Sequence, residues 1–208
     1  MSDSANPNQL PVIASEVRTC EKCDLARGRI HAVPGEGNPQ AQVMLIGEGP
    51  GFHEDAQGKP FVGNSGNFLT SLLEKAGLNR DDVFITNVVK CRPPSNRDPL
   101  PDEMASCSNY LDRQIATIDP DVIVTLGRFS MSRYFPGDRI SKIHGQAFTR
   151  DGRLVVPMYH PAAALHQGSL RAVIEEDFLR LPKFLAEASR ERESTAQRAE
   201  NATQTSLF

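Results

Sequence analysis

The stretch QVMLIGEGPG, residues 42–51, is a short apolar run that leads directly into a glycine-rich turn. Three other runs share its apolar, β-branched character: DVFITNVVKC (82–91), DVIVTLG (121–127) and LVVPMYH (154–160). Such runs are typical of buried strands in parallel sheets. Helical patterns lie between them, at residues 65–76, 101–118 and 128–135. Because strands alternate with helices, the sequence predicts an α/β fold with a short, mainly parallel central sheet.

The length of 208 residues favours a single domain with tails. Residues 1–14 are polar and contain two prolines, so we expect a flexible lead before a folded domain at 15–186. Asp151-Gly152 predicts a hairpin that adds one antiparallel strand before the last strand. Residues 187–208 carry charges of both signs without apolar periodicity, which predicts a disordered tail.

Composition excludes some classes of protein. The apolar fraction is 39% and no apolar run approaches the roughly 18 residues of a spanning helix, so we expect no membrane insertion. The N-terminal MSDSANPNQLP has neither a cationic nor an apolar segment, which predicts a cytoplasmic protein. The net charge of −3 gives no overall basic field, so any binding to nucleic acid must use a local patch.

The four cysteines form one candidate metal site. Cys20 and Cys23 form a C-x2-C pair, Cys91 ends a predicted strand, and Cys107 lies on the next predicted helix. Two thiolates on one turn and two from nearby elements can supply the four ligands of an iron–sulfur cluster or a structural zinc, and the spacing does not choose between them. The alternative is four unrelated buried thiols.

Four features follow predicted strands or lie in the connecting loops, where open α/β sheets place their binding sites. The GEGPG turn (47–51) permits close approach of a ligand but is also compatible with a purely structural turn. Phe61 could stack on a flat ligand or belong to the core, and Asn87 could bind a ligand or a structural partner. His160 follows the last strand and begins HPAAAL. We expect all four features on one rim.

These segments, in this order, resemble the type-4 uracil-DNA glycosylases, the iron–sulfur branch of their superfamily. The resemblance rests on C-x2-C-x-L-x-x-x-R (20–29), GEGPG (47–51), GKPFVGNSG (58–66), TNVVKCRPPSNRDP (86–99), Cys107 and HPAAAL (160–165), and it covers about residues 16–186. It implies a three-layer α/β/α fold and a [4Fe–4S] cluster on Cys20, Cys23, Cys91 and Cys107. It also implies a monomeric, monofunctional enzyme that hydrolyses the N-glycosidic bond of deoxyuridine in DNA and leaves an abasic site.

The resemblance also implies roles for individual residues. Phe61 would stack on the flipped uracil, and the Asn87 amide would read its N3–H and O4. His160 would donate to O2 of the departing uracil anion. The backbone of Glu48, Gly49 and Pro50 would line the same pocket.

The best-known branch of the superfamily has a water-activating Asp where Gly49 stands. Glu48 is the carboxylate nearest in sequence to that position, so we assign water activation to Glu48. Glu54 is the candidate for the wall that excludes the thymine methyl group.

Several features concern the DNA around the pocket. Candidate phosphate contacts are Arg27, Arg29, His31, Lys90, Arg92, Arg97, Lys142 and His144. Leu165 would wedge into the gap that the flipped base leaves, and His166 follows it where many relatives carry Arg.

The chain ends in QTSLF, which resembles the peptide that bacterial proteins insert into the replicative sliding clamp. Gln204, Leu207 and Phe208 would make that contact, and a tail that folds back on its own domain is the alternative.

Activity on DNA predicts association with the nucleoid. Two other functions remain open: an iron–sulfur protein that recognises uracil or damaged DNA without turnover, and a zinc-stabilised nucleotide-binding α/β protein.

Overall fold

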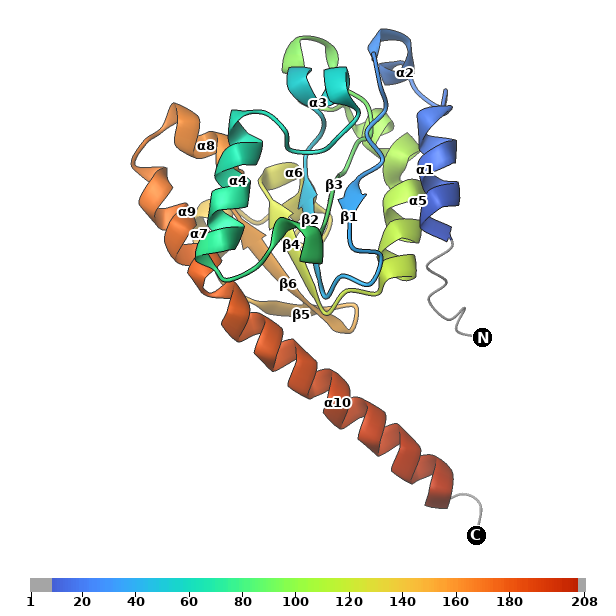
Figure 1. The fold of residues 1–208 in the computed structure, drawn as a ribbon, viewed down its shortest axis with the longest axis vertical. Coiled ribbons are helices and arrows are strands. Elements are labelled where there is room, and N and C mark those ends of the chain that lie inside the picture. Colours follow the sequence, from blue (N-terminus) through green and yellow to red (C-terminus); the bar gives the residue numbers. More distant parts are fainter. Residues whose placement is uncertain (1–8, 206–208) are drawn as a thin grey trace.

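The structure is a computed structural model that describes residues 9–205 of the chain. Its six strands form one sheet in the order β1-β3-β2-β4-β6-β5 (Figure 1). Their bounds are β1 Glu36–Gly37, β2 Val43–Gly47, β3 Phe84–Asn87, β4 Val122–Leu126, β5 Phe148–Arg150 and β6 Arg153–Met158. The four inner strands are parallel, and β1 and β5 add antiparallel edges. The predicted strands and the hairpin at 151–152 are therefore confirmed, whereas the two-residue β1 was not predicted.

The helices connect and cover these strands. Their bounds are α1 Gln9–Arg18, α2 Leu25–Gly28, α3 Phe52–Gln57, α4 Asn64–Lys75, α5 Pro101–Ile118, α6 Arg128–Ser132, α7 Ile140–Ile143, α8 Pro161–His166, α9 Leu170–Leu179 and α10 Leu181–Thr205. Two short 3-10 helices, η1 Arg80–Asp82 and η2 Pro94–Asn96, lie in the connections before and after β3. Within the described residues, no helix combines the length and the apolar character that crossing a bilayer requires.

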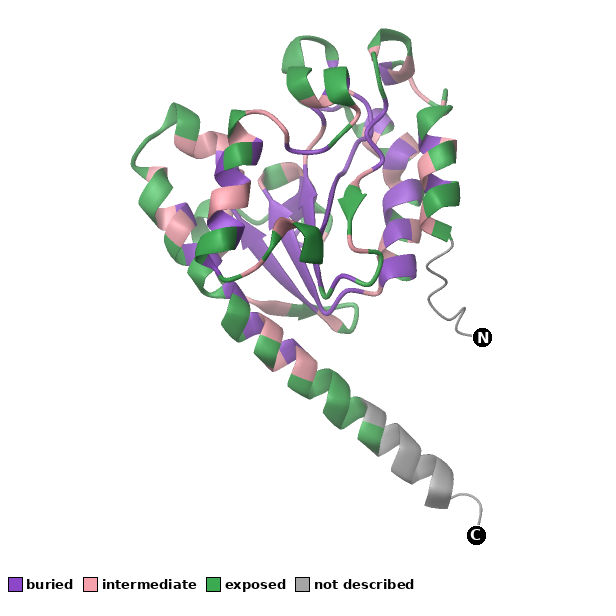
Figure 2. Cartoon of the chain, in the orientation of Figure 1, coloured by how far each residue is buried: buried purple, intermediate pink, exposed green. Residues whose placement is uncertain are grey.

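The sheet is covered on both faces. Val43 and Leu45 of β2 pack with residues of α4 and α9, while Met44 and Ile46 pack against α5 and α6 on the other side. Alternate residues of one strand point to opposite faces, so both faces of these strands must be apolar. Figure 2 shows the inner strands buried between helices whose outer faces are exposed. This arrangement confirms the three-layer α/β/α fold.

The domain begins earlier than the sequence predicts. Helix α1 starts at Gln9, and Ile13 and Val17 are fully buried against α5 and the region of the cysteines. Pro11 lies in the first turn of α1, where proline is tolerated because its missing N–H has no helical partner. The expected flexible lead is therefore wrong for residues 9–14, and residues 1–8 lie outside the described residues.

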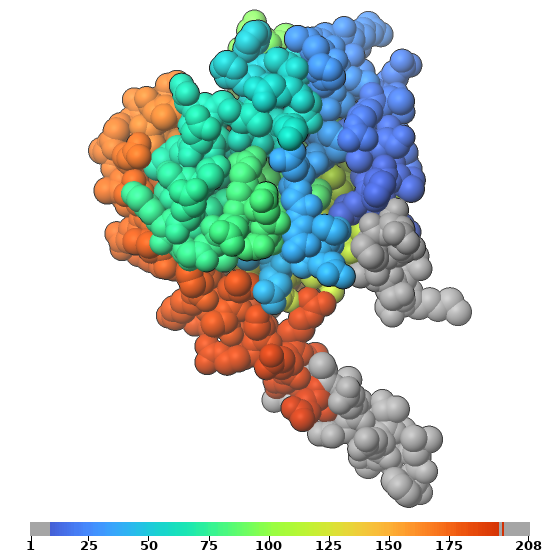
Figure 3. Space-filling view, in the orientation of Figure 1, coloured from blue at the N-terminus to red at the C-terminus, as the bar shows by residue number. Residues whose placement is uncertain are grey.

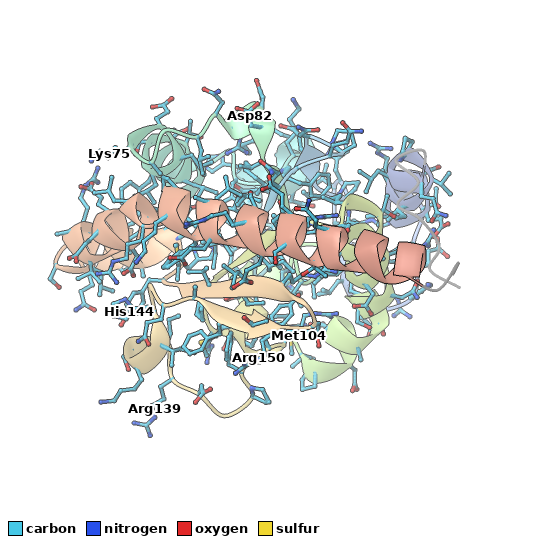
Figure 4. All side chains as sticks on the ribbon, turned by 90° about the horizontal axis from the view of Figure 1, so that it is seen from below. Lys75, Asp82, Met104, Arg139, His144 and Arg150 are labelled. Atoms are coloured by element: carbon cyan, nitrogen blue, oxygen red, sulfur yellow. The ribbon has the colours of Figure 1, made fainter. Side chains whose placement is uncertain are left out.

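The expected disordered tail is also wrong for residues 187–205, because α10 continues to Thr205. Ala188 is buried, and Arg192 donates to the carboxylates of Asp119 and Asp121 at 2.6 Å each. Charges of both signs are compatible with a solvated helix, as the Lys183–Glu187 pair illustrates. Helix α10 leaves the body of the domain in Figures 1 and 3, and Figure 4 shows it from below, in front of the sheet. Leu207 and Phe208 lie outside the described residues, as does the Gln204 side chain.

Candidate active site

The carboxyl ends of the inner strands surround one pocket of about 580 Å³. Gly47 at the end of β2 is paired in register with Asn87 at the end of β3, and His160 follows β6. The pocket is lined by Glu48, Gly49, Pro50, Gly51, Glu54, Phe61, Ser65, Asn87, Pro93, Asn96, Arg97, Asp98, His160, Ala162, Ala163 and His166. All six residues predicted to bind substrate are in this set. The shared rim is therefore present, and the individual roles remain predictions.

Asn87 is a buried polar side chain with an unused acceptor. It is 1% exposed, and its Oδ1 has no hydrogen-bond partner in the structure. A buried acceptor without a partner costs about 1–3 kcal/mol, so an unpaired amide at a pocket wall is ready to receive a donor from a ligand. Gly47 makes room for it, because a Cβ there would lie 2.4 Å from Asn87 Oδ1. This neighbour explains why the strand ends in glycine.

Phe61 is held rigidly beside Asn87. Its φ of 50° lies in the left-handed region, which is unfavourable for a phenylalanine and indicates that its surroundings fix the conformation. Gly66 of α4 packs directly against it, since a Cβ at that position would lie 1.9 Å from the Phe61 carbonyl oxygen. The Phe61 ring is stacked with the His160 ring at a centroid distance of 5.4 Å and an interplanar angle of 25°.

His160 is the N-cap of α8 and is fixed in one tautomer. Its Nδ1 accepts a hydrogen bond from the Ala162 backbone N–H at 3.1 Å, which places the ring proton on Nε2. Burial lowers the pKa of His160 to about 4, against a smaller opposing effect of the Glu54 carboxylate. The side chain is therefore a neutral donor at physiological pH, with its N–H on the nitrogen that the helix leaves free.

Glu48 supplies a carboxyl group whose pKa is raised. Burial raises the pKa of Glu48, the nearby Asp98 raises it further, and Arg128 lowers it. Arg128 is itself paired with Asp98, so the three groups form a charged cluster at the pocket rim. A carboxyl group whose pKa moves toward neutrality becomes a better proton acceptor at neutral pH. Sequence reasoning missed Asp98 and Arg128, although Asp98 lies within a quoted motif.

Glu54 lies in the pocket wall, but its oxygens are already used. Oε2 accepts from the Gly51 N–H at 3.1 Å, and Oε1 accepts from the N–H groups of Val62 and Gly63 at 2.9 and 3.0 Å. This single side chain therefore joins the GEGPG turn to the loop that carries Phe61. The sequence offered no signal for this link, because it depends on two loops meeting in space.

The cysteines come together on the α5 side of the domain. Cys91 and Cys107 are buried in a small core with Ile13, Val17 and Tyr110, and Cys20 and Cys23 pack against it. All four are free thiols. Burial raises the pKa of Cys91, the nearby Arg29 lowers it, and the neighbouring Cys23 and Cys20 raise it.

Two donors point at the cysteine sulfurs. Arg29 Nη1 donates to Cys91 Sγ at 3.2 Å, and the Lys90 backbone N–H donates to Cys107 Sγ at 3.3 Å. Such donors suit thiolate ligands. Within the described part of the chain, no group of three or more His, Cys, Asp or Glu side chains is arranged to hold a single metal ion. Four cysteine side chains are the donor set that either an iron–sulfur cluster or a structural zinc ion requires.

Three of the predicted phosphate contacts are buried or half-buried and are bonded within the domain. Lys90 is 1% exposed, and its ammonium donates to Thr86 Oγ1, the Asn87 carbonyl and Gln114 Oε1 at 2.6–2.9 Å. It cannot reach DNA; it fixes the backbone that carries the Asn87 amide.

Arg29 also donates to the Cys20 and Arg18 carbonyls, and His144 Nδ1 is 2.7 Å from Asp177 Oδ2. The sequence signal, a positive charge close to a motif, does not distinguish buried structural donors from exposed ones.

The other predicted positive groups stay closer to the surface. Arg97 lines the pocket, where its guanidinium forms two hydrogen bonds with the Glu103 carboxylate, at 2.9 and 2.6 Å. Arg27 is exposed and pairs with Asp24. His31 Nδ1 is 3.0 Å from the Asp55 carbonyl oxygen, and Lys142 lies on α7. Leu165 is half-exposed, as its predicted wedge function requires.

This fold and pocket define a protein of the α/β glycosylase type, and comparison with known proteins agrees. Residues 34–181 match the model of the uracil DNA glycosylase superfamily, and the chain belongs to that superfamily.

Within it, the chain is 51% identical over 189 residues to the type-4 uracil-DNA glycosylase of Saccharolobus solfataricus, covering 86% of this chain and 88% of the relative. It is 45% identical over 178 residues to the type-4 enzyme of Archaeoglobus fulgidus (81% and 89% coverage). It is 41% identical over 181 residues to that of Thermotoga maritima (85% and 94%). The resemblance found in the motifs is thereby confirmed.

Proposed function

We propose that this protein is a monofunctional uracil-DNA glycosylase that hydrolyses the N-glycosidic bond of deoxyuridine in DNA and leaves an abasic site. The observation that carries the proposal is the pairing of two groups in one pocket: the unpaired Asn87 Oδ1 and the neutral His160 imidazole. The sequence match to type-4 uracil-DNA glycosylases supports it. A binding protein without turnover would not need a preset donor in the same pocket as the base-reading amide.

Asn87 accounts for selectivity. Uracil presents N3–H as a donor and O4 as an acceptor, which complement the carbonyl and NH2 groups of an amide. Cytosine reverses both groups and would leave buried polar atoms without partners, so the pocket would reject it. Phe61 would hold the flipped ring by stacking, worth about 1–3 kcal/mol, against the few kcal/mol needed to unstack it.

His160 and Glu48 account for bond cleavage. As the glycosidic bond breaks, negative charge develops on uracil and positive charge on the sugar. The Nε2–H of a neutral His160 would donate to uracil O2, and such preorganised donors are worth about 3–4 kcal/mol. Glu48, whose pKa burial raises, would accept the proton of the attacking water and face the cationic sugar.

A base-release assay tests this function. Oligonucleotides containing U, T, C or hypoxanthine are incubated with the protein and then with alkali, which breaks the strand at abasic sites. We expect cleavage at U, with C and T resistant. His160→Ala should lower the single-turnover rate by about 10²- to 10³-fold with little change in DNA binding. Asn87→Ala should lose both rate and selectivity. A wild-type protein that binds uracil-containing DNA without breaking it would refute turnover.

We propose that a [4Fe–4S] cluster is bound by Cys20, Cys23, Cys91 and Cys107. The free thiols, the two donors to sulfur and the type-4 relatives support it. The cluster would join the turn between α1 and α2, the loop after β3, and α5, and no catalytic step is assigned to it. Anaerobically purified protein should be brown and contain about four irons per chain, and Cys107→Ser should lose both signals. A colourless protein that contains zinc would contradict the assignment.

We also propose the bacterial replicative sliding clamp as a partner, through Gln204, Leu207 and Phe208. The resemblance of QTSLF to clamp-binding peptides supports this, and α10 carries that end of the chain away from the domain. The domain itself would act on DNA as a monomer at the nucleoid. Removing Leu207-Phe208 should abolish co-elution with the clamp while excision on free oligonucleotides stays unchanged. Clamp retention by the truncated chain would contradict the proposal.

A further inference from the structure

An exposed aromatic ring lies next in sequence to a residue that lines the pocket. Phe52 begins α3 directly after Gly51, the last residue of the glycine-rich turn that lines the pocket. It is 56% exposed, whereas Phe61 and Phe68 nearby in the sequence are buried. An aromatic side chain offers a large apolar face, and leaving it in water forgoes the stabilisation that burial would give. Because Phe52 follows a residue that lines the pocket, contact with the substrate would explain why its ring is exposed.

A cation covers this ring and ties it to the pocket. The Arg92 guanidinium carbon is 5.2 Å from the centroid of the Phe52 ring. Arg92 Nε donates to Asn96 Oδ1 at 2.7 Å, and Asn96 lines the pocket. Phe52 at the start of α3 and Arg92 from the loop after β3 therefore form one unit that joins two separate segments of the chain. The His53 ring meets the edge of Phe52 at a centroid distance of 5.4 Å.

This unit has the chemistry of a nucleotide-binding platform. Proteins that bind single-stranded DNA combine aromatic rings, on which bases stack, with cations that attract the phosphates. A nucleotide whose base enters the pocket has neighbours on both sides, and these must lie at the pocket mouth. In a duplex the neighbouring bases are already stacked and paired, whereas in a single strand their faces are free.

We propose that Phe52, backed by Arg92, stacks on the base that flanks the flipped uracil, and that this contact favours single-stranded over duplex substrates. The proposal rests on the uracil-excising function proposed above. It makes Phe52 a substrate-binding residue outside the uracil pocket itself. Leu165, the predicted wedge, is half-exposed on α8, which follows His160, so the two apolar side chains lie on different helices, α3 and α8.

The test removes the ring, the flanking base, or both. Wild type and Phe52→Ala are compared on single-stranded oligonucleotides in which uracil has normal neighbours, or an abasic tetrahydrofuran residue on its 5′ or 3′ side. Phe52→Ala should lower kcat/KM on the normal strand by about 5- to 150-fold, the range expected for one base–aromatic contact. Removing the stacked neighbour should lower the wild-type value by a similar factor. On that abasic strand, Phe52→Ala should cause no further loss.

Controls separate stacking from other effects. Phe52→Trp should retain the wild-type rate, and the inhibition constant for free uracil should be unchanged in Phe52→Ala because the pocket is intact. Leu179→Ala removes an apolar side chain of similar exposure, 57%, from α9 and should change nothing. The duplex rate should fall less than the single-strand rate in Phe52→Ala.

Two outcomes would overturn the proposal. Equal loss on normal and abasic strands would show that Phe52 supports the pocket rather than a neighbouring base. Unchanged rates of Phe52→Ala on every strand would exclude a contact between Phe52 and DNA. The exposed ring would then be a candidate contact for a protein partner. If wild type released no uracil from any strand, the proposed function would fail instead, which is a different result.

Discussion

Gly47→Ala adds a single methyl group at the end of β2, next to Asn87 and Phe61. The backbone of Gly47 is ordinary strand, so the alanine introduces no conformational strain of its own. The new Cβ would lie 2.4 Å from Asn87 Oδ1 and 2.7 Å from Phe61 Cζ. Both groups must move, and each is assigned to binding of the base.

The expected loss follows from these two contacts. Asn87 Oδ1 must move by at least about 0.6 Å to reach a tolerable separation, which breaks its alignment with the pyrimidine edge. Losing that hydrogen bond costs about 1–3 kcal/mol, and displacing the stacked ring costs about 1–3 kcal/mol more. We therefore expect kcat/KM to fall by between about 30-fold and about 2 × 10⁴-fold. Overpacking should lower the free energy of unfolding by about 1–3 kcal/mol, a shift in Tm of about 2–4 °C per kcal/mol.

Single-turnover excision on a uracil-containing single strand measures the effect, with thermal unfolding recorded in parallel. Gly28→Ala is the matched control, because a Cβ at Gly28 meets nothing within 4 Å. It should retain the wild-type rate and Tm. A Gly47→Ala protein with kcat/KM within threefold of wild type would refute the placement of Asn87 and Phe61 as the groups that hold the base.

Three further predictions concern protonation and the packing of loops and helices. His160 stays neutral in the folded protein down to about pH 4, whereas an unfolded histidine takes up a proton near pH 6.5. Between these pH values the unfolded chain binds more protons than the folded protein, so His160 should lower the free energy of unfolding by about 3 kcal/mol as the pH falls from 6.5 to 4. Denaturant unfolding of the wild type and of His160→Gln across this pH range measures the effect. Equal pH dependence of the two proteins would contradict the prediction. Glu54→Gln should weaken the link between the two loops, lowering Tm and the excision rate together, whereas unchanged kinetics would show that the loops hold without it. Arg192→Ala should increase hydrogen exchange in α10 without changing the excision rate. Arg190→Ala is the control, because the Arg190 side chain bonds only within its own helix. Equal protection of α10 in both variants would show that the contacts of Arg192 to Asp119 and Asp121 do not hold the helix.

The layered core was predictable because its signals are local. Runs such as VMLIG and VIVTL have apolar residues on both faces, and only a strand covered on both sides satisfies them. The hairpin at 151–152 was predictable for a similar reason, since Asp-Gly specifies a tight turn. The pocket rim followed from topology, because parallel strands bring their carboxyl ends to one edge.

What the sequence did not reveal depends on contacts between distant segments. Lys90 has the same charge as Arg92, two residues later, yet one is buried under Gln114 and the other covers an exposed ring. The sequence prediction of flexible ends was wrong because a polar composition indicates exposure to solvent but does not exclude a helix. Helices α1 and α10 each bury only a narrow stripe of side chains. The tautomer of His160 also needed coordinates, since it is set by the backbone of Ala162.

The direction of α10 has a practical consequence. Arg192 fastens this helix to Asp119 and Asp121, which precede β4, whereas the pocket lies at the opposite ends of the strands. The helix has 25 residues and is therefore about 38 Å long. A fluorophore, bead or fused protein attached after residue 205 would sit far from the entrance for DNA, so immobilisation through that end should present the pocket to the solution unobstructed.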